Sequence, residues 1–241
     1  MSKFQKRVSR DLGLPAGYGS YGVAKRIRVI DQAVSLVGMR VLDLGCGNGS
    51  YTAELQRRAR WVCGLDFQWH YLEAVQGEIP RVQGVGEHLP FREESFDAVT
   101  MIEVLEHTRS DTQVLEECFR VLKPGGRLIL FVPNKLYPFE THPCHLGRLS
   151  LGHNIPFVSW LPEFLRGRMA TARIYSRLGI VRMARAAGFQ VTRVGYIFPP
   201  LDNFPLPFKQ AYRRLSRRLE ATPLAIFGVS IFVLLTKPAN H

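Results

Sequence analysis

The chain has 241 residues, of which 46% are hydrophobic, so it can bury a sizeable core and does not have the composition of a disordered protein. Its 32 lysines and arginines outnumber its 20 aspartates and glutamates, which gives a net charge of +12. This excess favours an anionic partner such as nucleic acid, an acidic membrane surface or a phosphorylated substrate; a charge that serves only solubility is the alternative.

Cysteine usage and apolar runs indicate the compartment. Cys46, Cys63, Cys118 and Cys144 include no C-x-x-C pair, which predicts reduced thiols in a cytosolic protein. The basic N-terminal stretch lacks the apolar segment of a secretory signal. The longest apolar run, residues 224–235, is too short to cross a bilayer as a helix. We therefore expect a cytoplasmic protein, peripheral at the inner face of a membrane at most.

Hydrophobic periodicity predicts an amphipathic helix over residues 22–37, followed by alternating strands and helices. The expected strands are 40–44, 61–66, 81–85, 96–102, 127–132, 190–198 and 229–236. The expected helices between them are 50–59, 69–78, 110–122 and 175–187. This alternation predicts an α/β fold, in which a parallel sheet has helices on both faces.

Two long stretches interrupt the alternation, at residues 135–174 and 199–226. The last two strands lack a crossover helix, so we expect them to form an antiparallel hairpin at the sheet edge, with the second stretch at its tip. We expect one domain over residues 1–241, in which residues 1–37 form an N-terminal cap region and the two stretches are inserts.

The segment VLDLGCGNGS, residues 41–50, is a strand that breaks into a loop with three glycines. The spacing is G-x-G-x-G, whereas the dinucleotide-binding fingerprint is G-x-G-x-x-G. Asp43 precedes the loop, and Asp66 ends the second strand, where a carboxylate can accept both hydroxyls of a ribose. The pattern predicts a nucleotide site, although this loop alone is weak evidence.

Five motifs occur in order: VLDLGCGNG, LDF, GEHLPFREESFDAV, EVLEH and LKPGGRLILFVPN. Together they resemble class I S-adenosylmethionine-dependent methyltransferases of the type 11 group, closely over residues 38–135, and the chain is similar to ubiquinone-biosynthesis O-methyltransferases. The resemblance implies a Rossmann-like, seven-stranded, mostly parallel sheet with the last strand antiparallel. It also implies S-adenosyl-L-methionine as the cofactor.

The resemblance further implies a cofactor-binding set, which consists of Asp43, Gly45, Cys46, Gly47, Asp66, Phe67, Glu87, His88 and Ile102. Asp43 and the loop backbone would surround the methionine part, Asp66 would hold the ribose, and Phe67 would lie beside the adenine. One departure is Val85, since many family members carry an acidic residue there that contacts the adenine amino group. For Glu87, a solvated loop charge is the alternative.

The stretch IEVLEH places three candidate catalytic residues, Glu103, Glu106 and His107, just beyond the end of a strand. General base catalysis by His107 is one interpretation, because an ordinary imidazole pKa of about 6.5 suits that task. In a purely structural interpretation, His107 closes the loop, and Glu106 begins the next helix or pairs with an arginine.

A third interpretation is a metal site, in which Glu103, Glu106, His107 and His142 hold Mg²⁺ or a similar ion that acidifies a substrate hydroxyl. The E-x-x-E-H pattern resembles that of metal-assisted ubiquinone-pathway O-methyltransferases and of small-RNA 3′-end 2′-O-methyltransferases. However, ETHPCHLG departs from the histidine-rich pattern of the RNA enzymes. His142, Cys144 and His145 could also form a separate metal site or line a substrate lid.

Both inserts mix bulky apolar residues with arginines, and the family topology would make them a lid over the active site. Within the second insert, Tyr212, Leu215 and Leu219 fall on one helical face beside several basic residues. A basic helix with an apolar stripe is typical of membrane-surface binding, so residues 205–220 are the candidate contact with an anionic membrane. The alternative is that these apolar residues pack on the domain.

RNA is the rival explanation of the positive charge. Tyr196, Phe198 and Phe204 could stack on bases, but the basic residues lie mostly among aliphatic residues and prolines. We therefore expect methyl transfer to an oxygen of a lipophilic or lipid-linked small molecule, such as a quinone precursor, polyketide or glycolipid. The alternatives are an RNA 2′-O-methyltransferase and a non-catalytic cofactor-binding regulator or assembly partner.

Overall fold

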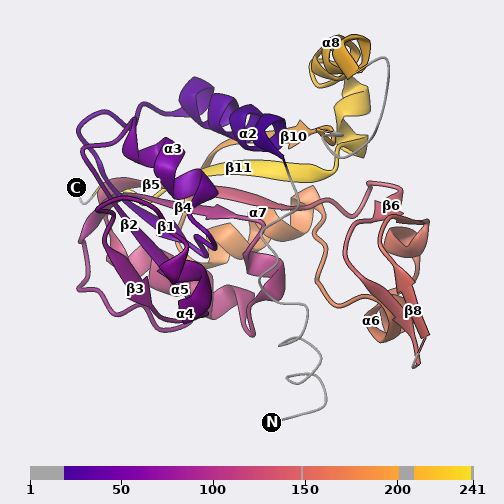
Figure 1. Ribbon diagram of the computed structural model, residues 1–241, viewed down its shortest axis with the longest axis horizontal. Helices are drawn as coiled ribbons and strands as arrows, with labels where there is room; N and C mark the ends of the chain where they lie inside the picture. Colours follow the sequence, from indigo (N-terminus) through magenta and orange to yellow (C-terminus); the bar gives the residue numbers. More distant parts are fainter. Residues whose placement is uncertain (1–18, 148, 201–208, 240–241) are drawn as a thin grey trace.

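A computed structural model describes residues 19–147, 149–200 and 209–239, and a seven-stranded sheet forms its centre (Figure 1). The strand order is β10-β11-β5-β4-β1-β2-β3. These strands are β1 (Arg40–Leu44), β2 (Trp61–Asp66), β3 (Arg81–Gln83), β4 (Phe96–Ile102), β5 (Leu122–Pro133), β10 (Gln190–Ile197) and β11 (Ser230–Thr236). Strands β1 to β5 pair in parallel, whereas β11 runs antiparallel to both β5 and β10. The expected mostly parallel sheet, with an antiparallel hairpin at one edge, is confirmed.

Helices cover both faces of the sheet, as expected. The helices are α5 (Asp111–Val121) and α7 (Arg177–Ala186) on one face and α2 (Ser20–Ala33) and α3 (Ser50–Gln56) on the other (Figure 1). Val114 and Ile180 are buried in the first of the two resulting cores, and Ile27 and Leu55 are buried in the second. Because the central strands are buried on both faces, their sequences are nearly continuous apolar runs.

Several element ends differ from the prediction, for local reasons. Helix α2 ends at Ala33 rather than at residue 37, because Val34 is extended and the chain turns through Gly38 at a φ of +78°. Helix α4 (Trp69–Glu73) ends well before residue 78, and Gly77 adopts a positive φ there. Strand β5 begins at Leu122, so the Pro-Gly-Gly segment that stops α5 is already part of the strand. Ser110 caps α5, since its side chain accepts a hydrogen bond from Gln113 N.

The first insert forms a small lobe beside the sheet. Its elements are β6 (Phe139–Glu140), β7 (Cys144–Leu146), β8 (Leu149–Gly152), β9 (Ile155–Pro156), η2 (Val158–Trp160) and α6 (Glu163–Met169). Strand β6 pairs with β9, and β7 pairs with β8. Figure 1 places this lobe at the right, at the end of the sheet from which β5 leads into it. These short strands were not predicted from the sequence.

The second insert contains α8 (Lys209–Leu219) and η3 (Pro223–Phe227), and α8 stands apart from the sheet in Figure 1. The residues of the predicted apolar face of α8 differ in burial: Tyr212 and Leu219 are half-buried, whereas Leu215 is 53% exposed. Phe204, the first part of the 205–220 segment and residues 1–18 of the N-terminal cap region lie outside the described residues. Within the described ranges, no helix has both the length and the apolar character that a membrane span requires.

Candidate functional site

The glycine loop after β1 is held against the end of β2 by backbone hydrogen bonds. Gly45 N and Cys46 N both donate to Leu65 O, at 2.7 and 3.0 Å. Gly45 has a φ of +75°, and a Cβ added to it would lie 2.3 Å from a methyl carbon of Val104. At Gly47, which also has a positive φ, a Cβ would meet nothing within 4 Å. The loop is therefore packed tightly at its first glycine and open at its second, where the nucleotide is expected.

Asp43 lies in β1, just before this loop. Its carboxylate is buried and accepts hydrogen bonds from Thr52 Oγ1 of α3 at 2.7 Å and Thr100 Oγ1 of β4 at 2.8 Å. Burial raises the pKa of Asp43 to about 6, although the two hydroxyl donors oppose the shift. The predicted cofactor residue is thus also a buried junction between β1, α3 and β4.

Asp66 lies at the carboxyl end of β2, where the sequence placed it. Its two carboxylate oxygens accept hydrogen bonds from Gly47 N at 2.9 Å and Gln68 N at 3.0 Å. Phe67, the predicted neighbour of the adenine, is 40% exposed beside it. The carboxylate thus links the open glycine of the loop to the end of β2, and each of its oxygens keeps a second lone pair for a ligand.

The other predicted cofactor residues are more varied in their surroundings. Glu87 accepts a hydrogen bond from Arg109 N at 2.6 Å, so its carboxylate ties its loop to the start of α5. The exposed His88 places Nε2 3.4 Å from Gln113 Nε2, and Ile102 is buried at the end of β4. Glu87 was predicted either to contact the adenine or to be a solvated loop charge. Its contact with Arg109, which lies 22 residues further along the chain, was not predicted.

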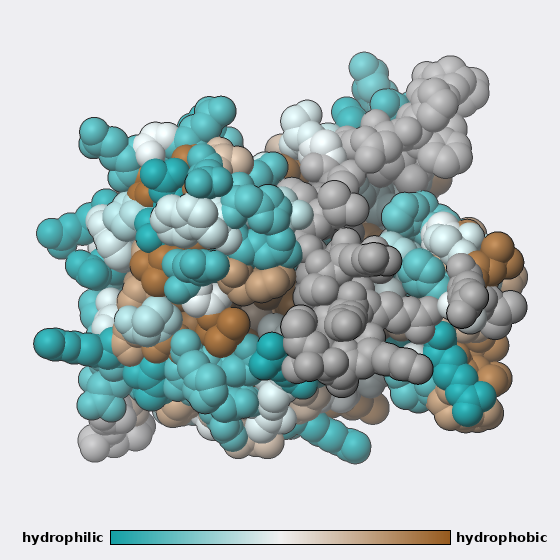
Figure 2. Space-filling model, turned by 60° about the horizontal axis from the view of Figure 1, so that its bottom comes forward, coloured by the Kyte–Doolittle hydropathy of each residue, from teal (hydrophilic) through white to brown (hydrophobic). Residues whose placement is uncertain are grey.

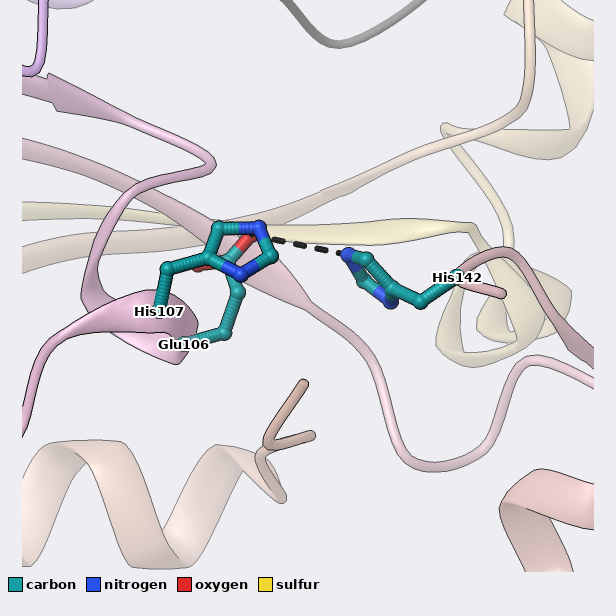
Figure 3. Close-up of side chains that lie close together, drawn as sticks. All are labelled: Glu106, His107 and His142. Carbon is teal, nitrogen blue, oxygen red and sulfur yellow. Dashed lines mark ion pairs between the residues drawn. The ribbon is translucent and has the colours of Figure 1, made fainter. Parts of the chain in front are cut away.

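Three candidate residues meet beyond β4 (Figure 3). Glu106 and His107 belong to η1 (Leu105–His107), and His142 comes from the first insert, so that the carboxylate and the two imidazoles point toward one another. Glu106 Oε1 lies 3.9 Å from His107 Nε2 and 4.0 Å from His142 Nε2. One ligand atom from each of the three residues lies within 4.8 Å of the others.

The Glu106 carboxyl group is buried without a hydrogen-bond partner. Glu106 is 2% exposed, both of its oxygens lack a donor, and the histidine separations are too long for hydrogen bonds. Burial, followed by the nearby Glu103 carboxylate, raises the pKa of Glu106 well above its ordinary value. An orphaned carboxyl group between two imidazoles fits the donor set of a cation site.

The surroundings of His107 alter the basicity assumed from sequence. Burial, with smaller contributions from His142 and Arg173, lowers the pKa of His107 to about 3. The ring is therefore neutral at physiological pH and a weak proton acceptor, whereas a general base works best with a pKa near the operating pH. A neutral imidazole is the form that binds a metal ion.

Glu103 has a different environment from the other three metal candidates. Its Oε1 accepts hydrogen bonds from Arg26 Nη2 of α2 at 2.7 Å and Ser230 Oγ of β11 at 2.5 Å. Its backbone is left-handed, with a φ of +55°. The structure therefore brings together Glu106, His107 and His142, while the carboxylate of Glu103 is engaged by α2 and β11.

Two residues that belong to no recognised motif hold Glu106 and His142 in place. Glu140 Oε1 lies 3.0 Å from His142 Nδ1. Near the end of the same insert, Arg173 pairs with Asp111 at 2.6 Å and donates to Leu105 O at 2.9 Å, on the segment that carries Glu106. Sequence reasoning missed Arg173, because Asp111 and Leu105 become its neighbours only when the insert folds back. It missed Glu140, because a glutamate two residues before a histidine is too common to stand out. Within the described residues, Cys144 and His145 join no group of three potential ligands.

Comparison with known proteins shows a likeness over the first part of the sheet. Residues 42–130 match the family described as a methyltransferase domain. Over these residues, which are less than half of its length, the chain is similar to methyltransferase domains. The matched range contains the glycine loop, Asp66, Glu106 and His107, whereas His142 and both inserts lie beyond it.

Curated relatives of the methyltransferase domain include ubiquinone biosynthesis O-methyltransferases of Pseudomonas putida and Pseudomonas fluorescens. Each is 36% identical over 121 residues, which are 46% of this chain and 51% of the relative. The match thus spans about half the length of these curated relatives.

Solved structures share the fold over most of the chain. A SAM-dependent methyltransferase from Thermotoga maritima has a TM-score of 0.62 at 19% identity and covers 90% of this chain and 89% of its own. An S-adenosylmethionine-dependent methyltransferase from Mesorhizobium loti has a TM-score of 0.60 at 17% identity, with 92% and 99% covered. The cyclase SpnF also matches, with a TM-score of 0.60, 17% identity, and 98% and 93% covered. At these identities the likeness shows the fold alone, and the reaction depends on the residues of the site.

Proposed function

We propose that this protein transfers the methyl group of S-adenosylmethionine to an oxygen of a lipophilic small molecule. The observation that carries the proposal is the cluster of Glu106, His107 and His142 at the same sheet edge as the glycine loop and Asp66. Ligands of open α/β sheets bind at this edge, outside the carboxyl ends of the strands. The curated relatives named as O-methyltransferases of ubiquinone biosynthesis support an oxygen acceptor of lipophilic character.

The cofactor supplies an electrophilic methyl group on a sulfonium, and the chain supplies orientation. In the proposal, Asp66 binds the ribose hydroxyls and Phe67 lies against the adenine. The open backbone at Gly47 admits the methionine end, and Asp43 lies just before the loop in β1. Cys46 has a buried thiol whose pKa burial raises, so it contributes backbone and packing rather than a nucleophile.

We further propose that Glu106, His107 and His142 hold a divalent cation. The orphaned, buried oxygens of Glu106 between two imidazoles are the structural feature that fits such an ion. A bound ion would lower the pKa of an acceptor hydroxyl. Two imidazole nitrogens and one carboxylate favour a transition-metal ion over Mg²⁺, which prefers oxygen ligands and bound water.

The exposed surface of the inserts suits a lipophilic acceptor. Leu149, Phe157, Trp160 and Phe164 of the first insert are each about half exposed or more. Figure 2 shows this lobe at the right, with apolar surface between hydrophilic residues. On α8, Leu215 is exposed beside Arg214 and Arg218. We propose that these inserts form a lid and dock on the anionic inner face of a membrane.

The first experiment measures transfer of labelled methyl groups from S-adenosylmethionine into a cell extract, followed by partition between phases. We expect label in the organic phase, and loss of transfer by about 100-fold or more in Glu106→Gln and His142→Ala. His153→Ala is the matched control, because His153 is exposed on the same insert and lies outside the cluster. Treatment with a chelator should mimic the two cluster variants if a cation is required.

Other outcomes would replace the proposal. Label in the nucleic-acid fraction would favour an RNA 2′-O-methyltransferase, for which the basic inserts would be phosphate contacts. Failure to bind S-adenosylhomocysteine in calorimetry would contradict both enzyme hypotheses and leave a regulator or assembly partner. Full transfer by Glu106→Gln would show that the cluster has no part in the chemistry.

A further inference from the structure

His142 reaches the cluster on a carboxylate support built by the first insert. Glu140 Oε1 lies 3.0 Å from His142 Nδ1 and accepts a hydrogen bond from the His142 backbone N–H at 3.2 Å. Glu140 is only 1% exposed, so this carboxylate is part of the interior of the insert. The ring is therefore gripped at one nitrogen, while its other nitrogen faces Glu106 across 4.0 Å.

Glu140 is in turn held by an arginine from further along the insert. Arg166 is buried in α6, with Nη1 3.5 Å from Glu140 Oε2 and a hydrogen bond of 2.8 Å to Ala172 O. The remaining guanidinium nitrogens of Arg166 bond Glu163, whose side chain is exposed. The charge of Glu140 is thus compensated in the interior through Oε2, and Oε1 stays directed at the histidine.

This arrangement determines which ring nitrogen carries the proton. A carboxylate oxygen can only accept hydrogen bonds, so the nitrogen that faces it must be the protonated one in a neutral imidazole. The Nδ1 atom of His142 then donates to Glu140, and Nε2 presents its lone pair to the cluster. We propose that Glu140 is a positioning residue that fixes His142 in the Nδ1–H tautomer, with the Nε2 lone pair aimed at Glu106.

The consequence for a ligand rests on the cation site proposed above. An outer carboxylate on a ligating histidine fixes the ring and increases its basicity, and its loss typically lowers metal affinity about 10- to 100-fold. The tautomer itself, in contrast, is a property of the protein without any ion. The two statements can therefore be tested separately.

The experiment uses the full chain labelled with ¹⁵N at its histidine rings, first without metal and then titrated with Mn²⁺ in a calorimeter. The His142 signals are identified by their loss in His142→Ala. Glu140→Gln keeps an acceptor oxygen near Nδ1 but removes the charge. Glu140→Asp keeps the charge opposite Arg166 but draws the carboxylate back from the ring. Glu163→Ala is the matched control, since Glu163 bonds the same arginine without reaching the histidine.

We expect a single Nδ1–H tautomer in the wild type, in Glu140→Gln and in Glu163→Ala, and a mixture of tautomers in Glu140→Asp. Mn²⁺ affinity should fall about 10- to 100-fold in Glu140→Asp and stay unchanged in Glu163→Ala. A wild-type ring protonated on Nε2, or an unchanged tautomer in Glu140→Asp, would overturn the inference. If the wild type shows the Nδ1–H tautomer but binds no Mn²⁺, the cation site fails while the positioning role of Glu140 stands.

Discussion

At the residue scale, two glycines of one loop give a contrast that separates folding from binding. Gly45→Ala adds a methyl group against Val104 on a left-handed backbone, so we expect it to destabilise the protein by about 3 kcal/mol or more. Gly47→Ala meets only open space and should cost about 1 kcal/mol of backbone strain. Urea denaturation measures both costs.

For cofactor binding we expect the opposite order, with Gly47→Ala as the more damaging of the two variants. Calorimetry with S-adenosylhomocysteine should show a loss of more than about tenfold for Gly47→Ala, since its methyl group fills the space proposed for the cofactor. Unchanged affinity in Gly47→Ala would place the cofactor elsewhere.

Asp43 should make stability depend on pH. Because burial raises the pKa of the folded protein's Asp43 to about 6, above its ordinary value of 3.8, its contribution is fully present below pH 3.8 and is lost as the pH rises through 6. A shift of about 2 units corresponds to about 3 kcal/mol. Asp43→Asn should therefore gain stability relative to the wild type between pH 4 and pH 8, as measured by urea denaturation across this range.

Asp97 provides the control of opposite sign for this pH dependence. Its hydrogen bond from Lys123 helps to lower the pKa of its carboxyl group, although partial burial opposes the shift. Its contribution is therefore present at neutral pH and lost on acidification. The difference in unfolding free energy between Asp97→Asn and the wild type should thus grow as the pH rises, and a parallel trend in both variants would contradict the assignment.

Single residues were predictable from sequence where a motif fixed the backbone around them. Asp66 could be placed because it ends a strand, and Asp43 because it lies one residue before the end of a strand that leads into the glycine loop. The partners of Glu87 could not be placed, since Arg109 approaches it only through the docking of the next helix. Glu140 offered no signal at all, because a carboxylate two residues before a histidine is common and only the fold of the insert buries it.

At the element scale, α2 is fixed to the sheet by a buried charged contact. Arg26 is fully buried, and its guanidinium reaches Glu103 beyond β4 and Ser230 of β11. Removing one partner of such a pair leaves the other charge uncompensated, so Arg26→Met should cost about 3–5 kcal/mol. Because Arg26→Met combined with Glu103→Gln removes both charges, the double variant should recover much of this loss in a urea double-mutant cycle. Additive losses would show that the two side chains are not coupled.

The sheet elements were more predictable than the inserts. The bounds of β1, β2 and β4 agree with the prediction, because buried parallel strands give continuous apolar runs between clear turn signals. The strands of the first insert have two to four residues, which is too short for any periodicity to stand out. On α8, the helical pattern correctly grouped Tyr212 with Leu219, but the exposure of Leu215 depends on how the helix rests against the domain.

At the scale of the whole molecule, the net charge of +12 predicts electrostatic attraction to an anionic surface. If α8 docks on a membrane, replacing the exposed Arg214, Arg217 and Arg218 by glutamine should weaken binding to phosphatidylglycerol vesicles about 100-fold, at about 1 kcal/mol per charge. Flotation measures this, and added salt should weaken the wild type in the same way.

The control for this prediction keeps the same change in net charge. Arg57, Arg60 and Arg92 are exposed outside the two inserts, and their triple glutamine variant removes three charges as well. It should retain most of the vesicle binding. Equal losses in both triple variants would show that overall charge alone, and not the α8 surface, determines the attraction.

The position of β11 has a consequence for the order in which the molecule can assemble. This strand is made after β10 but lies between β10 and β5 in the sheet. Until residues 230–236 leave the ribosome, the apolar edge of β5 has no neighbour, and β10 has no strand to join. A nascent chain stalled before residue 230 should therefore expose an unpaired, aggregation-prone strand edge and recruit chaperones. Release of β11 would then complete this side of the sheet in a single late step.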